Sequence, residues 1–262
     1  MKTLYVMDPL ESLNLEGDST YMMMLEANNR GGTTFWCTPQ DLFALGGRAF
    51  AKMIEVHVLA VEPFFIQGPA VDTDLGEMDV IWMRKDPPFD MAYIFSTYML
   101  DLVPSSTLVL NDPRAIRNFN EKMYALHFAE YCPETLVTRE ISRAKQWAKK
   151  HPKVVIKPWD GNGGRGVLVT SHEDPNFGSM LEILTDNQQE YILVQEYLPE
   201  IIEGDKRIIL IGGEAVGQML RVPQKGDHRG NIHVGAGVQA CELTDREREI
   251  CAVLAPELQK HN

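Results

Sequence analysis

The sequence predicts an α/β protein whose first part is built on a parallel sheet. The chain opens with an apolar run at 4–7, a Met- and Leu-rich stretch at 18–29 and a second apolar run at 33–37. This order of strand, helix and strand is typical of a parallel sheet. Further along, a glycine-rich loop joins two β-branched runs at 154–157 and 167–170, which predicts a hairpin.

The first part continues with alternating strands and helices. Asp18-Ser19 is expected to cap a helix that ends near Asn29. Several short strands are expected around 55–66, followed by a buried strand at 79–83. A helix from Met91 to about Leu102, a strand at 107–111 and a helix starting at Asp112-Pro113 complete this part.

A charged turn follows the strand at 79–83. It reads Arg84-Lys85-Asp86-Pro87-Pro88-Phe89-Asp90. Ligands of open α/β sheets gather beyond the carboxyl ends of strands, and the two prolines make this turn rigid. The turn therefore either holds Arg84 and Lys85 towards an anionic substrate or is an ordinary solvated turn, and composition alone favours neither.

The second part is expected to start near residue 120. Its predicted elements are helix 120–130, strand 134–138, helix 141–151, the glycine hairpin, helix 175–185, strand 191–196, a hairpin of 205–211 and 214–220 that turns at Gly212-Gly213, and a terminal helix 242–260. The glycine-rich segment 221–238 is either a mobile lid or an irregular loop.

The glycine loop is the strongest local signal for chemistry. Gly161, Gly163 and Gly166 match G-x-G-x-x-G, but a dinucleotide fingerprint would open a helix, and a strand follows here. Backbone N–H groups of such a tip form an anion-binding concavity, and Lys157 can reach the same phosphates. The loop lacks the Gly-Lys-Ser/Thr ending of a Walker loop, and the chain has no kinase motifs. The alternative is an ordinary flexible hairpin.

Composition and charge limit the classes of binding partner that the protein is expected to have. The chain has 262 residues, 44% apolar content and a net charge of −12, which disfavours nonspecific nucleic-acid binding. We expect no membrane partner, because no apolar stretch approaches the length of a span. The four cysteines lack metal-type spacing, and the N-terminus lacks signal-peptide features, so a cytoplasmic location is expected.

Several motifs, taken in order, resemble the ATP-grasp ligases: Asn120-Glu121-Lys122, Val155-Ile156-Lys157-Pro158, Asp160-Gly161-Asn162-Gly163-Gly164, Gln195-Glu196-Tyr197-Leu198 and Gly204-Asp205-Lys206-Arg207. The run from Arg84 to Asp90, with Val6-Met7-Asp8-Pro9, Pro133-Glu134-Thr135-Leu136-Val137-Thr138 and Arg229-Gly230-Asn231, is similar to the bacterial glutathione synthetase branch. The resemblance spans nearly the whole chain. It implies an ATP-grasp fold preceded by a Rossmann-like parallel-sheet domain at 1–120, with a central lid subdomain at 121–200 and an incomplete C-terminal subdomain at 201–262.

The resemblance implies an ATP- and Mg²⁺-dependent ligase, with Mn²⁺ as an alternative ion, that joins γ-glutamylcysteine to glycine and acts as a homo-oligomer. A carboxylate of the dipeptide would attack the γ-phosphate, and the glycine amine would displace phosphate from the acyl phosphate. Such chemistry relies on positioning and charge neutralisation.

Residue roles are also implied by the resemblance. Arg207 and Arg221 would be catalytic. ATP would contact Lys122, Lys157, Gly161, Asn162, Gly163, Gly164, Gln195, Glu196, Tyr197, Leu198 and Asp205, and substrates would contact Arg84, Arg229 and Asn231. The plain alternatives are a helix-surface lysine for Lys122 and cross-strand charge partners for the two catalytic arginines.

The sequence departs from the family pattern at two places. Gly235-Ala236-Gly237 stands where the family has Gly-Gly-Arg. The family continues past the position of Asn262 into strands with an Asp and a Glu-x-Asn pair that hold the metal ions. We therefore expect the metal ligands beyond residue 262 and weak turnover by residues 1–262 alone. Two other functions remain open: a ligase for a different amino acid, and a non-catalytic nucleotide-binding remnant.

Overall fold

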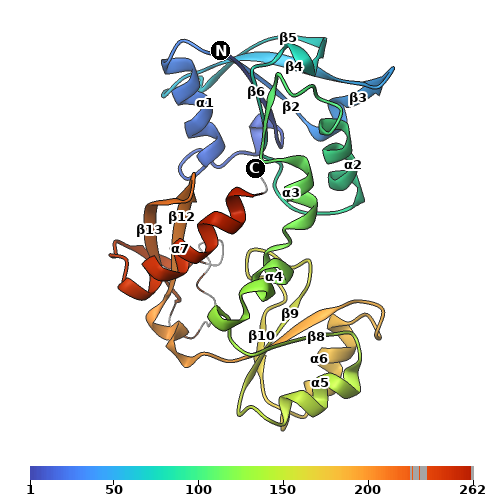
Figure 1. Ribbon diagram of the computed structural model, residues 1–262, viewed down its shortest axis with the longest axis vertical. Coiled ribbons are helices and arrows are strands. Elements are labelled where there is room, and N and C mark those ends of the chain that lie inside the picture. Colours follow the sequence, from blue (N-terminus) through green and yellow to red (C-terminus); the bar gives the residue numbers. More distant parts are fainter. Residues whose placement is uncertain (225, 227–229, 231–234, 261–262) are drawn as a thin grey trace. The chain divides into compact units, whose positions relative to one another are not determined.

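The structure is a computed structural model that describes residues 1–224, 226, 230 and 235–260 (Figure 1). The chain forms two compact units, residues 1–120 and the residues from Glu121 onward. Short 3₁₀ turns lie at Leu10–Ser12, Pro39–Asp41, Leu75–Glu77 and Pro199–Glu203. Among the described residues, no helix has the length and apolar character needed to cross a bilayer.

The first unit is built on a seven-stranded sheet with the order β3-β4-β2-β1-β6-β7, in which β5 also pairs with β4. The strands are β1 (Lys2–Val6), β2 (Thr33–Cys37), β3 (Leu42–Leu45), β4 (Arg48–Val58), β5 (Phe65–Asp74), β6 (Val80–Met83) and β7 (Leu108–Leu110). The pairs β2–β1, β1–β6 and β6–β7 are parallel, whereas β4 pairs antiparallel with β2. This confirms the predicted parallel sheet.

Helices lie on both faces of this sheet, α1 (Ser19–Asn29) on one and α2 (Met91–Leu100) and α3 (Pro113–Asn118) on the other. Alternate β1 residues therefore enter two cores: Leu4 packs with Leu100 of α2, and Tyr5 packs with Met24 of α1. The helices begin where the sequence indicated, because Asp18, Asp90 and Asp112 each accept backbone N–H bonds at the first turn.

The region 38–77 differs from the expectation of several short strands around 55–66. It forms the short strand β3 and the two long strands β4 and β5, which pair antiparallel. Every second residue of the first half of β4 is buried, including Ala49, Ala51 and Met53, so one face of a single strand covers the core.

In the second unit, a four-stranded antiparallel sheet has the order β10-β9-β11-β8. The strands are β8 (Thr135–Thr138), β9 (Val154–Pro158), β10 (Leu168–Thr170) and β11 (Ile192–Glu196). Helices α5 (Ile141–Ala148) and α6 (Phe177–Leu184) pack on one face, where they bury Val154, Ile156, Ile192 and Val194. The opposite face of this sheet carries the candidate site.

The helix expected over 120–130 is interrupted. The structure has α4 (Glu121–Tyr124) followed by a 3₁₀ segment (Ala125–Tyr131). The backbone leaves helical geometry at Phe128, with φ −122° and ψ 47°, so a continuous amphipathic helix does not form.

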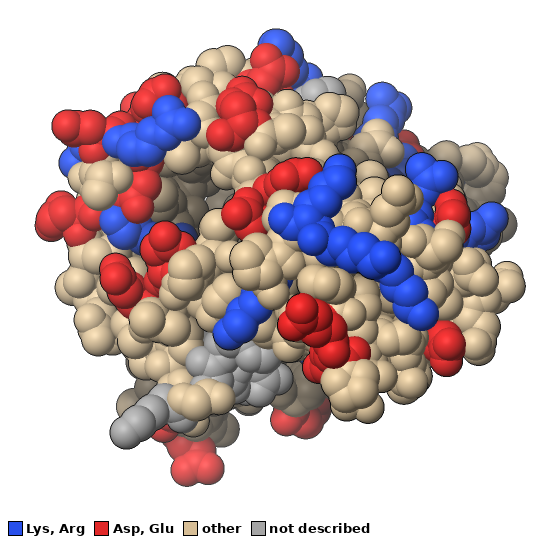
Figure 2. All heavy atoms as spheres, turned by 90° about the horizontal axis from the view of Figure 1, so that it is seen from below, with Lys and Arg blue, Asp and Glu red and all other residues tan. Residues whose placement is uncertain are grey.

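The second unit also contains a three-stranded antiparallel sheet of β12 (Asp205–Ile211), β13 (Glu214–Val222) and β14 (Gly237–Gln239), with α7 (Asp245–Gln259) beside it. The β12–β13 turn uses Gly212 and Gly213 at φ 59° and 89°, which confirms the predicted two-residue hairpin. Lys206 Nζ pairs with Glu247 Oε2 at 2.7 Å and ties α7 to this sheet. On the face drawn in Figure 2, basic side chains lie among acidic ones.

Candidate functional site

The glycine loop joins two antiparallel strands. Ile156 of β9 pairs with Leu168 of β10, which confirms the predicted strand–loop–strand. Gly163 and Gly164 have φ of 62° and 81°, a region that side chains with a Cβ rarely adopt. At the base of the loop, a Cβ on Gly161 would lie 2.5 Å from Cγ of Pro158. The loop conformation therefore depends on glycine.

One row of side chains crosses the four-stranded sheet on the face opposite the helices. Thr135, Gln195, Val155 and Val169 are paired in register from β8 through β11 and β9 to β10. Residues paired across antiparallel strands share a face, so these four side chains form a common floor. Lys157, two residues after Val155, lies on the same face.

A cavity of about 310 Å³ lies over this floor, within the range of small-molecule sites. Its lining combines the sheet floor, the glycine loop, the segment after β11 and the start of the second sheet. The lining residues are Pro133, Val155, Lys157, Gly164, Val167, Val169, Gln195, Glu196, Tyr197, Leu198, Ile201, Asp205, Arg221 and Gly230. Apolar side chains thus surround a small number of charged groups.

Lys157 is held by a chain of side-chain hydrogen bonds. Its Nζ donates to Gln195 Oε1 at 2.5 Å, and Gln195 Nε2 donates to Thr135 Oγ1 at 2.8 Å. The Thr135 hydroxyl donates in turn to the Pro133 carbonyl at 2.8 Å. The ammonium is therefore fixed at the edge of the cavity by residues from β8 and β11.

A second lysine approaches the same region. Lys122 Nζ donates to the Gly161 carbonyl at 2.5 Å and pairs with Glu121 Oε1 at 2.7 Å. Burial lowers the pKa of Lys157, and the positive charge of Lys122 lowers it further. Two cationic side chains therefore converge on the glycine loop, an arrangement suited to a polyanionic ligand.

Across the cavity, Asp205 and Arg221 form a bidentate pair between β12 and β13. Arg221 Nε and Nη2 donate to the two carboxylate oxygens of Asp205, each at 2.7 Å. The side chains are 35% and 14% exposed, respectively, so the pair is only partly open to solvent. Gly230 lies against it, because a Cβ there would be 2.8 Å from Asp205 Cγ.

The structure brings most of the expected nucleotide residues together. Lys157, Gly164, Asp205, Arg221 and the segment from Gln195 to Leu198 line one cavity, and Lys122 reaches it through Gly161. Arg207 lies two residues beyond Asp205 on the same face of β12, exposed and outside the described lining. The expected substrate residues Arg229 and Asn231 lie outside the described residues.

Arg84 belongs to the first unit, at the carboxyl end of β6. Its Nε donates to Thr20 Oγ1 at 3.0 Å. Burial raises the pKa of the neighbouring Tyr5 hydroxyl to about 12, and Arg84 opposes that increase. Lys85, which the sequence placed either towards an anionic substrate or in an ordinary solvated turn, pairs with Asp8 at 2.8 Å.

Sequence reasoning missed the two valines of the cavity floor and the contact that Thr135 makes with Gln195. Val155 and Val169 line the cavity, and Thr135 positions Gln195. The spacing of Val155 from Lys157 was a usable signal, because residues two apart on a strand share a face. Thr135 had no local signal, since its contact spans 60 residues of sequence.

The described residues do not supply a metal centre. They contain no group of three or more His, Cys, Asp or Glu side chains that could hold an ion. Both oxygens of the Asp205 carboxylate, which lines the cavity, accept hydrogen bonds from Arg221. We therefore derive no catalytic step through a metal ion from these residues.

Comparison with known proteins identifies the family. The family model "Prokaryotic glutathione synthetase, N-terminal domain" matches residues 1–117, and "Prokaryotic glutathione synthetase, ATP-grasp domain" matches residues 121–262. Glutathione synthetase of Mesorhizobium japonicum is 41% identical over 99% of this chain and 83% of its own length. The enzyme of the same name from Agrobacterium fabrum is 41% identical over 97% of this chain and 80% of its own length.

Solved structures support the same fold. D-cycloserine synthetase DcsG superposes with a TM-score of 0.65 at 14% identity, covering 99% of this chain and 82% of its own. D-alanyl-alanine synthetase A from Vibrio cholerae superposes with a TM-score of 0.59 at 13% identity, covering 99% and 80%. On the family models and the close sequence relatives, the chain belongs to the prokaryotic glutathione synthetase family and has an ATP-grasp fold.

Proposed function

We propose that this protein is an ATP-dependent carboxylate–amine ligase that joins γ-glutamylcysteine to glycine and releases glutathione, ADP and phosphate. Membership of the glutathione synthetase family supports the reaction. The observation that carries the assignment is the cavity in which Lys157 and the glycine loop face the segment from Gln195 to Leu198. ATP and a divalent cation are the cofactors of the family, and we propose Mg²⁺ as the ion, with Mn²⁺ as the alternative.

In the proposed reaction, the dipeptide carboxylate oxygen forms a bond to the γ-phosphorus as the bond to ADP breaks. The glycine amine then forms the amide bond, loses a proton, and expels phosphate from the acyl phosphate. We propose that Lys122, Lys157 and the backbone N–H groups of 161–164 bind the phosphates, because neutralising their charge is the main task in phosphoryl transfer. Arg207 and Arg221 are proposed to stabilise the charge of the transferring group.

The remaining residues of the site are proposed to bind adenine and the substrates. The segment from Gln195 to Leu198 is proposed to hold adenine, with Val155 and Val169 packed against the base and Asp205 close to the nucleotide. Arg84, Arg229 and Asn231 are proposed to contact the dipeptide or glycine. The three-part division at residues 120 and 200 and a homo-oligomeric assembly are further parts of this proposal.

A phosphate-release assay tests the reaction. We expect release to require ATP, γ-glutamylcysteine and glycine together, and to exceed the release with other pairs of amino-acid substrates. A larger rate with another acceptor would assign the chain to a different ligase. ATP binding without any substrate-dependent release would favour a non-catalytic nucleotide-binding protein.

Replacing Thr135 by valine is expected to weaken ATP binding by about 2- to 10-fold, the loss of about one net hydrogen bond. Valine keeps the shape but cannot accept from Gln195, so Lys157 loses its fixed position. Isothermal titration calorimetry measures the change. Thr170→Val is the matched control, because Thr170 pairs with Val154 on the opposite face of the same sheet. Equal affinities for the Thr135 variant and the parent would contradict the positioning role.

Nucleotide binding is expected to take up protons at alkaline pH, where the nucleotide phosphates are already fully ionised. The pKa of Lys157 is lowered in the free protein by burial and by Lys122. Bound phosphates favour the charged amine and raise that pKa, so ADP affinity should fall as pH rises through the free-protein value. Calorimetry in two buffers of different ionisation enthalpy measures the uptake. Lys157→Arg should abolish it, and a parent protein without uptake would disprove the assignment.

A further inference from the structure

Arg84 lies at the carboxyl ends of two parallel strands of the first unit. Its backbone N–H donates to the carbonyl of Val6 at 2.7 Å, which continues the β1–β6 ladder by one residue. Ligands of open α/β sheets bind beyond the carboxyl ends of such strands. Arg84 is half-buried, so its side chain starts at this edge of the sheet and stays partly open to solvent.

A buried threonine of α1 holds one nitrogen of this side chain. Nε of Arg84 donates to Oγ1 of Thr20 at 3.0 Å. Thr20 is 5% exposed and lies in the first turn of α1, where Asp18 caps the helix by accepting from the Tyr21 N–H at 2.8 Å. A buried, β-branched side chain on a capped helix has little freedom to move. The contact therefore fixes the plane of the guanidinium, because Nε lies in that plane.

The two terminal nitrogens of Arg84 are left for another partner. A guanidinium carries donors on Nε and on both terminal nitrogens, and the contact with Thr20 uses only Nε. Within the described part of the chain, the Arg84 side chain makes no second hydrogen bond and no ion pair. The fork formed by Nη1 and Nη2 matches the two oxygens of a carboxylate.

The acidic residues near Arg84 do not occupy these nitrogens. Asp8 accepts from Lys85 Nζ at 2.8 Å and from the Asp86 N–H at 2.9 Å, and Asp86 itself is exposed. The formal charges of Asp8, Arg84, Lys85 and Asp86 cancel. What distinguishes Arg84 is therefore its unused hydrogen-bonding capacity and not a net positive charge.

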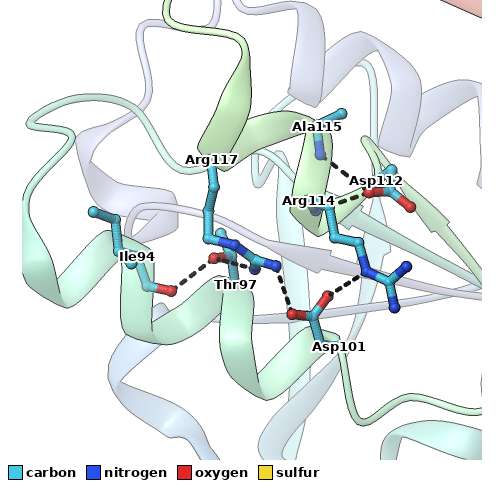
Figure 3. Close-up of polar contacts among 7 residues, drawn as sticks. All are labelled: Ile94, Thr97, Asp101, Asp112, Arg114, Ala115 and Arg117. Carbon is cyan, nitrogen blue, oxygen red and sulfur yellow. Dashed lines mark hydrogen bonds and ion pairs between the residues drawn. The ribbon is translucent and has the colours of Figure 1, made fainter. Parts of the chain in front are cut away.

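Arg117 of the same unit shows the arrangement that Arg84 lacks. Its Nη1 donates to Thr97 Oγ1 at 2.9 Å and its Nη2 to Asp101 at 2.6 Å, and the guanidinium lies over the Tyr98 ring, 4.6 Å from its centroid (Figure 3). A threonine and a carboxylate thus satisfy Arg117 within the fold. Arg84 has the threonine but, among the described residues, no carboxylate, so the carboxylate of a ligand can take that place.

We propose that Thr20 is a positioning residue for substrate binding: it holds Nε of Arg84 so that Nη1 and Nη2 together bind a carboxylate of γ-glutamylcysteine or of glycine. The inference rests on the proposed function and names a residue that acts on the substrate only through Arg84. A planar donor pair that is already oriented loses less entropy when the carboxylate binds. Without the threonine, part of the binding energy is spent on ordering the guanidinium.

Isothermal titration of the full chain with γ-glutamylcysteine, and then with glycine at saturating dipeptide and ADP, tests this role. For the substrate that Arg84 contacts, we expect Thr20→Val to weaken binding about 3- to 10-fold, the loss of about one net hydrogen bond. Thr20→Ser should restore the affinity, because serine keeps the acceptor. Thr97→Val is the matched control, since it removes the same kind of contact from Arg117 and should leave both affinities unchanged.

The titration in which the loss appears identifies the carboxylate. A loss with γ-glutamylcysteine assigns it to the dipeptide, and a loss with glycine alone assigns it to glycine. Unchanged affinity of Thr20→Val for both substrates, or equal losses in the two valine variants, would overturn this inference alone. A parent protein that binds neither substrate would contradict the proposed ligase, and the inference with it.

A double variant shows whether Thr20 acts through Arg84. Once Arg84→Met has removed the guanidinium, adding Thr20→Val should cause no further loss of substrate affinity, so the effects of the two changes should not add. A threonine with a merely structural role would weaken binding equally with and without Arg84. Additive losses would therefore refute the positioning role.

Discussion

Lys157→Met is expected to weaken ATP binding by about 10- to 150-fold, which corresponds to the loss of about 1.5–3 kcal/mol from hydrogen bonds to a charged group. Lys157 lies at the edge of the cavity, fixed by Gln195, with its ammonium beside the glycine loop. Methionine preserves most of the side-chain volume but supplies no charge. Isothermal titration with ATP measures the change directly, whether or not the chain turns over.

Lys150→Met serves as the matched control for this variant. Lys150 is an exposed lysine just after α5, on the helix-covered side of the same sheet. The same loss of charge there should leave the affinity within about twofold, because exposed charges more than a Debye length away are screened. If both variants lost affinity equally, the effect would reflect net charge and not a contact with the phosphates.

Arg221→Met is expected to weaken ATP binding by about 30-fold, about 2 kcal/mol, at the low end of the cost of truncating one partner of a buried charge pair. The smaller cost is expected because the Asp205 side chain is 35% exposed, so water can partly solvate its unpaired charge. Two effects act in the same direction: a cation is lost from the cavity, and the Asp205 carboxylate becomes an unpaired negative charge facing the phosphates.

The double variant separates these two effects. Asp205→Asn removes the repulsive charge, so Asp205→Asn combined with Arg221→Met should bind ATP more tightly than Arg221→Met alone. The difference between the two is the coupling energy of the pair. If the double variant binds no better than the single one, the Asp205 carboxylate does not face the nucleotide, and its proposed place in the site is wrong.

Features that depend on neighbouring residues could be predicted from the sequence. The glycine hairpin was predictable because the β-branched runs flank the loop directly. The starts of α1, α2 and α3 are likewise local, because each helix follows an N-cap aspartate: Asp18, Asp90 and Asp112. The prediction of one continuous helix over 120–130 was wrong, because hydrophobic periodicity does not reveal the departure from helical geometry at Phe128.

Features that depend on strand register could not be predicted. The floor of the cavity requires that Thr135 meet Gln195 and that Gln195 meet Val155, pairings set by the assembled sheet. The pairing of Lys85 with Asp8 likewise joins residues 77 positions apart in sequence. Most cavity residues were nevertheless anticipated, because the resemblance to ATP-grasp ligases supplied the spatial information that local patterns lack.

A crystal structure with a non-hydrolysable ATP analogue tests the central claim most directly. We expect the triphosphate between Lys157 and the loop 161–164, with the base over Val155 beside the segment from Gln195 to Leu198. A nucleotide bound away from this cavity, or a cavity without nucleotide at saturating concentration, would contradict the account.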